Sequence, residues 1–146
     1  MVPTLIGRIQ TRLFLLATVG VIVTLLIVPI LPGLTGPLGD NYRTAFLVLA
    51  SVAVLGVVWE LIYHFLMQFR WEKDWPTGFG LLTLVPEGLL LFFLIRSGVI
   101  EVIDEDLPAA AFWTHFIVVW VVVWLVANGP MRIPFIRWRF RGGRVL

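Results

Sequence analysis

Four long stretches of apolar residues, separated by short polar segments, dominate the chain. They cover residues 12–31, 44–69, 79–98 and 110–129. Each is long enough to cross the hydrocarbon core of a bilayer, which takes about 20 residues of helix. Backbone polar groups in lipid must be satisfied within the segment, so the stretches predict helices. The segments of about ten alternating residues that build a membrane β-barrel do not occur. The pattern predicts an all-α integral membrane protein, with residues 1–146 forming a single four-helix transmembrane domain.

The composition agrees with this class. Of the 146 residues, 60% are hydrophobic and only 14% are charged, whereas a soluble domain of this size carries far more charge. The sequence contains no cysteine, which excludes disulfides, cysteine-ligated iron–sulfur clusters and thiolate zinc sites. The first apolar stretch is longer than the core of a signal peptide, so we expect it to be a retained span.

The basic residues gather at the ends that a four-span arrangement places on one side of the membrane. Nine of the 11 lie there: Arg8, Arg12, Arg70, Lys73, Arg132, Arg137, Arg139, Arg141 and Arg144. The other side carries Arg43, Arg96 and the acidic residues Asp40, Glu101, Asp104, Glu105 and Asp106. Basic loops remain in the cytoplasm. This distribution predicts that both termini, including the basic tail over residues 130–146, are cytoplasmic.

Three polar side chains interrupt the second and third apolar stretches: Glu60, His64 and Glu87. We take Phe69 and Phe79 as the inner ends of the two spans. At a helical rise of about 1.5 Å per residue, Glu60, His64 and Glu87 then lie roughly 13, 7 and 12 Å deep. A short turn joins the two spans, so we expect them to be antiparallel neighbours. Glu60, His64 and Glu87 are therefore expected to meet in the inner half of the membrane.

Helical spacing places these polar residues on faces rich in small side chains. One face carries Leu49, Ala53, Gly56, Glu60 and His64, and the other carries Gly80, Thr83 and Glu87. Small residues are typical of close helix contacts in lipid. Both faces are therefore expected to point into the bundle or at a partner. Pro86 is expected to kink the third span beside Glu87.

Three interpretations of this buried polar cluster remain open. Charged groups at membrane depth are costly and commonly functional, which favours transport or a proton relay. A protonated glutamate that hydrogen-bonds across helices would instead lock the packing. Two carboxylates and one imidazole could also bind a metal, although the spacing Glu-x-x-His of di-iron bundles is absent. A haem between His64 and His115 is disfavoured because His115 is expected near the outer surface, beside the acidic loop. No cofactor is predicted.

Two further surfaces each allow two interpretations, a structural role or the binding of a partner. Trp113, Phe116, Trp120 and Trp124 share one face of the fourth span, which either packs in the bundle or on lipid, or docks a membrane partner. The tail "RIPFIRWRFRGGRVL" alternates arginines, including Arg137, Arg139 and Arg141, with apolar residues. It either anchors on anionic headgroups, at about 1 kcal/mol for each arginine, or docks on a partner's cytoplasmic surface. Nucleic-acid binding is not expected, because the basic residues are confined to the membrane surface.

No complete catalytic motif is present. The chain lacks a glycine-rich phosphate loop and a nucleophile elbow, and its only serines are Ser51 and Ser97. Neither serine belongs to a Ser/Lys or Ser/His pairing. We therefore predict that the protein is not an enzyme.

Residues 60–88, "ELIYHFLMQFRWEKDWPTGFGLLTLVPEG", carry a resemblance whose strongest part is "FRWEKDWPTGFG". They resemble small four-span membrane proteins of actinobacteria, and in particular the accessory subunit of the mycobacterial Mce lipid-import complex. The resemblance implies a multi-pass protein of the bacterial inner membrane that binds a permease-type subunit laterally. The prediction is a non-catalytic accessory subunit that stabilises such a complex. The alternative is a small transporter or proton-relay subunit, for example of a respiratory complex, working through Glu60, His64 and Glu87.

Overall fold

The computed structural model describes residues 4–69, 77–135, 138, 140 and 142–145, and this part of the chain is helical without a strand. Four of its helical stretches are long and apolar enough to cross a membrane. These are Leu5–Ile30, Leu38–Met67, Thr77–Arg96 and Ala109–Arg132. The predicted all-α, four-span class is therefore confirmed. The centre of the turn between the second and third spans, with Arg70 and Lys73, lies outside the described residues.

The first span begins earlier than the hydrophobic pattern indicates. Helix α1 (Leu5–Leu15) is capped by Thr4, whose hydroxyl accepts a hydrogen bond from the Gly7 amide at 3.1 Å. Such a cap satisfies an amide that would otherwise lack a partner at the start of the helix. Arg8 and Arg12 consequently lie within the helix, whereas the sequence placed them at or before its start.

Neither the first nor the third span is a uniform α-helix. The first continues as the π-helical η1 (Leu16–Gly20), then α2 (Val21–Ile27) and the 3-10 turn η2 (Val28–Ile30). The third is divided at Thr83 into α4 (Thr77–Leu82) and α5 (Leu84–Arg96). Pro86 cannot donate a backbone hydrogen bond into the preceding turn, so the expected interruption of this span is present one turn before Glu87.

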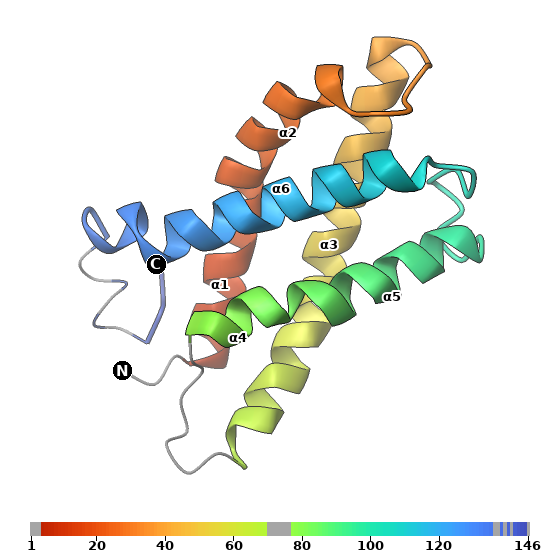
Figure 1. The fold of residues 1–146 in the computed structure, drawn as a ribbon. Helices are drawn as coiled ribbons and strands as arrows, with labels where there is room; N and C mark the ends of the chain where they lie inside the picture. The colour runs from red at the N-terminus through yellow and green to blue at the C-terminus, as the bar shows by residue number, and fades with distance from the viewer. Residues whose placement is uncertain (1–3, 70–76, 136–137, 139, 141, 146) are drawn as a thin grey trace.

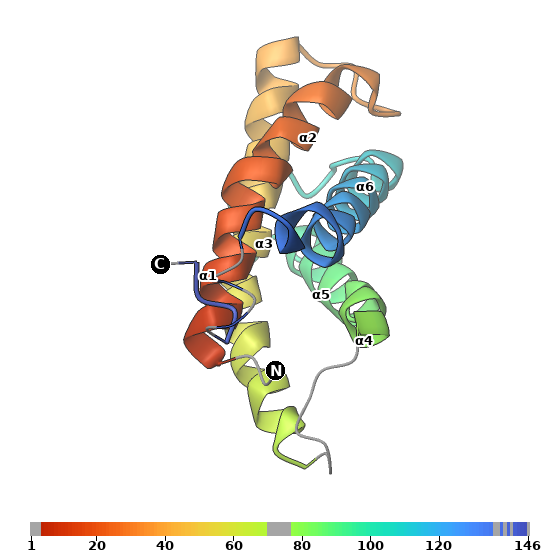
Figure 2. The same cartoon turned by 90° about the vertical axis from the view of Figure 1, so that its left-hand side faces the viewer.

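The spans form two helical hairpins that pack on each other. One consists of α1–α2 and α3 (Leu38–Met67), the other of α4–α5 and α6 (Ala109–Asn128), which continues into η3 (Pro130–Arg132). Figure 1 shows the second hairpin crossing the first obliquely, and Figure 2 shows the two as separate layers. The core between them is built from buried apolar side chains, among them Leu16, Leu49, Val52, Leu91, Phe112 and Phe116.

The C-terminal segment lies against the start of α1 on one side of the bundle (Figure 2). The Thr4 amide donates to the Gly142 carbonyl at 2.9 Å, and the Thr11 hydroxyl donates to the Gly143 carbonyl at 2.8 Å. The indole of Trp138 donates to the Thr11 hydroxyl at 2.7 Å. The described part of the tail is thus packed on α1. Arg137, Arg139 and Arg141 lie outside the described residues.

Candidate functional site

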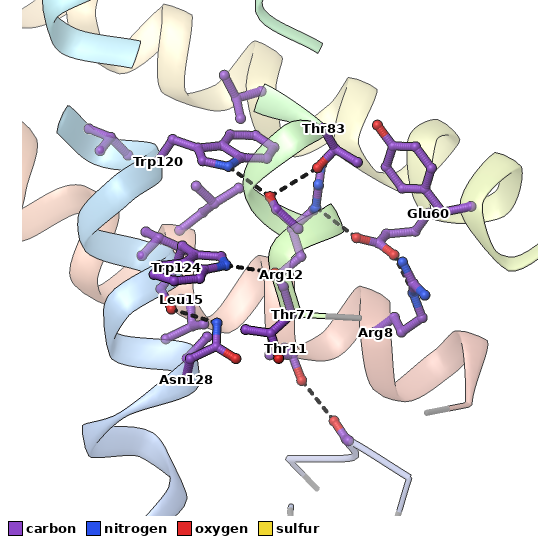
Figure 3. Close-up of a pocket in the computed structure, with 18 of the residues that line it drawn as sticks. Arg8, Thr11, Arg12, Leu15, Glu60, Thr77, Thr83, Trp120, Trp124 and Asn128 are labelled. Carbon is purple, nitrogen blue, oxygen red and sulfur yellow. Dashed lines mark hydrogen bonds and ion pairs between the residues drawn. The ribbon is translucent and has the colours of Figure 1, made fainter. Parts of the chain in front are cut away.

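Two arginines of α1 bind two glutamates from the second and third spans inside the bundle. Arg8 Nε lies 2.6 Å from Glu60 Oε2, and Arg12 Nε lies 3.0 Å from Glu60 Oε1. The other two nitrogens of Arg12 reach Glu87, Nη1 to Oε2 at 2.6 Å and Nη2 to Oε1 at 2.8 Å. Figure 3 shows Glu60 between Arg8 and Arg12. We call these four residues the charge network.

The charge network is buried and electrically balanced. The four side chains are 4% to 13% exposed, and two positive charges face two negative ones. The Glu87–Arg12 contact is bidentate, the strongest geometry for this pair. Neighbouring groups add to it: the Tyr63 hydroxyl donates to Glu87 Oε1 at 3.0 Å, and the Arg12 guanidinium lies 5.3 Å from the centre of the Trp120 ring.

The local sequence explains how Arg12 reaches both carboxylates. Arg8 and Arg12 are four residues apart, so they point from the same face of α1. On α3, Gly56 lies one turn before Glu60, and a Cβ atom added there would lie 2.7 Å from Arg12 Cδ. Gly56 thus leaves room for the arginine side chain. The small residue expected at a close helix contact lies against α1 and also admits a charged side chain.

Of the three residues expected to meet, the structure brings together Glu60 and Glu87 and leaves out His64. His64 forms no ion pair with either carboxylate in the described part of the chain. Its Nδ1 atom is buried without a hydrogen-bond partner there. The adjacent Tyr63 contacts Glu87 instead. Three contributors were not predicted from the sequence: Tyr63, Arg8 and Arg12.

Glu60 and Glu87 do not belong to a cluster of metal-ligating side chains in the described part of the chain. Both carboxylates are bound to arginine. Across the described ranges, no three histidine, aspartate or glutamate side chains come close enough together to hold a metal ion. The arrangement is that of a set of ion pairs, in which each carboxylate already has a cationic partner.

His115 is buried among the helices near the start of α6, and its expected position close to the outer surface stays a prediction. Only 3% of it is exposed, and its Nε2 lies 2.9 Å from the hydroxyl of Thr24, a fully buried residue of α2. The hydroxyl offers the imidazole a polar partner within the first span. This contact satisfies one nitrogen of the buried imidazole.

The aromatic face of α6 packs on the third span. A Cβ atom added at Gly88 would lie 2.7 Å from Phe116 and 2.8 Å from Trp113. The indole of Trp120 donates to the Gly80 carbonyl at 3.1 Å, and the indole of Trp124 donates to the Thr77 carbonyl at 3.1 Å. Packing within the bundle was one of the two interpretations of this face. Docking of a partner through it stays a prediction.

A cavity of about 330 Å³ lies beside the charge network, between α1, α3, α4 and α6 (Figure 3). One group of its lining residues is polar or charged: Arg8, Thr11, Arg12, Glu60, Tyr63, Thr77, Thr83, Asn128 and Arg132. Another is apolar: Leu15, Leu16, Leu49, Val52, Phe116, Val119 and Val123. Thr77 and Arg132 are exposed, so the cavity reaches the surface at the side where the termini lie.

No protein-family model matches the sequence, and neither a curated protein nor a solved structure is detectably similar to it. The resemblance of residues 60–88 to Mce accessory subunits therefore stays a prediction. Function has to be inferred from the charge network, the cavity and the outer surfaces of the bundle.

Proposed function

We propose that the protein is a non-catalytic accessory subunit that docks laterally on a bacterial inner-membrane complex and stabilises it. A permease-type subunit of an Mce-type lipid transporter is the partner that residues 60–88 favour. The observation that carries the accessory role is the internal pairing of the charge network. Its ionised groups are satisfied within the chain, which suits a structural part of an assembly better than a reaction centre.

The energetics of the charge network support a locking role. A single charged side chain at the centre of a spanning helix costs about 2.5–3.5 kcal/mol on insertion scales. Arg12 contacts Glu60 in α3 and Glu87 in α5, so one guanidinium joins three of the four spans. Removal of one partner from a buried ion pair typically costs about 3–5 kcal/mol. The network therefore holds the spans in one relative position.

The outer surface of the bundle suits contact with lipid or with another membrane protein. Large apolar side chains point outward from every span, for example Leu26, Val54, Phe93 and Leu125. The described connections between spans are short, covering residues 31–37 and 97–108. A partner would therefore be bound through the membrane-facing helices and the tail.

We further propose that both termini are cytoplasmic. The ends lie together, as the Thr4–Gly142 hydrogen bond requires. Arg8 and Arg12 no longer count as surface charges because they are paired inside the bundle. Seven other basic residues of the sequence belong to the side of the termini, and only Arg43 and Arg96 belong to the opposite side. The charge asymmetry that favours a cytoplasmic location is therefore retained.

The test is affinity purification of the tagged full-length chain in a mild detergent from the membranes of cells that make it, followed by mass spectrometry. We expect a permease and its ATPase in a fixed ratio to the chain. A variant with Arg137, Arg139 and Arg141 changed to Gln should recover less of them, whereas Arg43→Gln, a single change at the opposite end, should recover the wild-type amount. Recovery of a stable monomer without another membrane protein would contradict the proposal.

A second candidate function, proton relay or transport, is favoured by one observation. Two carboxylates contact the same guanidinium next to a cavity that reaches the surface. In this case Glu60→Gln or Glu87→Gln should abolish proton flux in proteoliposomes while the complex still assembles. His64→Gln is the matched control on α3, because His64 is not part of the charge network. Wild-type flux in both glutamate variants would exclude the relay.

A further inference from the structure

The cavity beside the charge network is long and narrow. Its lining residues on α6 extend from His115 to Asn128, over which a helix rises about 20 Å. Its volume is about 330 Å³, about twice that of an engineered protein cavity that accepts benzene. A volume of this size spread over such a length has room for one hydrocarbon chain of medium length. It is too small for a lipid with two chains.

The polarity of the wall changes along this length. The part of the wall toward His115 is apolar apart from that residue. It includes Leu15, Leu49, Val52 and Val119. At the other end, the wall includes the polar residues Thr11, Asn128 and Arg132 beside Ala127 and Trp138. Ligand pockets combine an apolar wall with a few polar groups that orient the ligand. The wall therefore matches a molecule with an apolar chain and one polar end.

The charges around the opening of the cavity determine which charge the polar head of a bound molecule should carry. Glu60 is the sole acidic residue among the described lining residues, and it is bound by Arg8 and Arg12. Arg132 is exposed; its Nη2 donates to Asn128 Oδ1 at 3.0 Å, and it forms no ion pair within the described ranges. A cationic opening next to a balanced network favours an anionic head, and the planar guanidinium fits a carboxylate.

We propose that this cavity binds one molecule of a fatty acid of medium chain length. The carboxylate lies at Arg132 and Asn128, and the chain lies along α6 toward His115. The site is formed within a single chain, so the inference goes beyond the accessory role and does not depend on any partner complex. It assigns the protein a ligand of its own, drawn from the leaflet that its open end faces.

The experiment uses the full-length protein in nanodiscs of phosphatidylcholine, with laurate as the probe and native mass spectrometry as the readout. We expect saturable binding of one laurate per chain. Dodecyltrimethylammonium, which has the same chain length and the opposite charge, should not compete. Tighter binding of dodecyl phosphate than of laurate would overturn the assignment of a carboxylate head, and binding that does not saturate would overturn the site itself.

Two substitutions on α6 distinguish the cavity from the outer surface of the helix. Val123→Trp fills the cavity and should weaken laurate binding by at least about tenfold, which corresponds to about 1.4 kcal/mol. Leu125→Trp is the matched control, because Leu125 is 52% exposed and does not line the cavity. If Val123→Trp does not fold, Ala127→Leu tests the same wall with a smaller change. Equal binding by a folded cavity variant and by Leu125→Trp would refute the proposal.

A third substitution tests the head position. Arg132→Gln should weaken laurate binding by about tenfold, as expected for the loss of a charged hydrogen bond, and should leave binding of the uncharged dodecanol unchanged. Arg43→Gln, on the other side of the membrane, should alter neither. An equal effect of Arg132→Gln on laurate and dodecanol would overturn the head position.

Discussion

Arg12 and Glu87 form a bidentate ion pair across 75 positions of sequence, with Nη1–Oε2 at 2.6 Å and Nη2–Oε1 at 2.8 Å. The same guanidinium uses its remaining nitrogen to contact Glu60. Since the two glutamates belong to different spans, the position of one side chain in the first span determines how the second and third approach each other. Arg12 therefore connects these three spans through a single side chain.

Arg12→Gln should destabilise the protein by about 3–5 kcal/mol, because it leaves Glu60 and Glu87 buried with too little positive charge. The free energy of unfolding is measured by titration with SDS in mixed micelles. Arg43→Gln, which changes an exposed arginine, should stay within about 0.5 kcal/mol of wild type. A double variant Arg12→Gln with Glu87→Gln should be more stable than the sum of the single effects predicts, by about 0.5–3 kcal/mol. Strict additivity would show that the pair does not interact.

Gly56→Ala should destabilise the bundle by about 1–3 kcal/mol, since the added methyl group displaces Arg12 from its position between the carboxylates. Gly39→Ala provides the control on the same helix, because no atom lies within 4 Å of the added methyl group. Alanine is the better helix former, so this second change should be neutral or stabilising by up to about 1 kcal/mol. Thermal unfolding in detergent measures both, and similar results for the two variants would contradict the role assigned to Gly56.

Thr24→Val should destabilise the protein by about 1–3 kcal/mol, because it removes the hydrogen-bond partner of a buried imidazole. The Thr18 hydroxyl donates to the Phe14 carbonyl four residues earlier in the same span, so Thr18→Val removes only a local contact. That control should change the unfolding free energy by less than about 0.5 kcal/mol. An unchanged midpoint for Thr24→Val would mean that the Thr24–His115 contact adds nothing to stability.

The absence of cysteine from the sequence allows a direct test of orientation. A single cysteine introduced as Asp104→Cys, in the loop before α6, should react with a membrane-impermeant maleimide in intact cells. A cysteine introduced as Arg144→Cys should react only after the membrane is permeabilised. Both positions are exposed, so access through the membrane decides the outcome. The reverse pattern would place the termini outside.

Much of the fold could be predicted from the sequence, because apolar length alone defines the spans. The meeting of Glu60 and Glu87 also followed from depth, since both lie a similar distance along neighbouring helices. The arginines did not follow, because Arg8 and Arg12 lie at the end of the first apolar stretch, where basic residues usually act as surface charges that orient the chain. A carboxylate in lipid needs a counter-charge, and a helix that begins at the Thr4 cap carries both arginines inward. The need for a counter-charge and the helix cap at Thr4 together could have predicted the charge network.

Side-chain direction was the part that the sequence left open. Tyr63 and His64 are adjacent on α3, so their side chains point about 100° apart, and the rotation of the helix decides which of them turns toward Glu87. That rotation is a property of packing between spans. The buried position of His115 depends in the same way on Thr24, a residue of another span. Patterns within one helix contain no information about such partners.

The order in which the charge network is synthesised bears on how the protein enters the membrane. Ribosomes complete Arg8 and Arg12 before Glu60, and Glu60 before Glu87. The first span would therefore meet lipid with two unpaired cations if it left the insertion machinery alone. We expect it to remain beside the translocon until the second and third spans arrive, so that the three partition into the bilayer together.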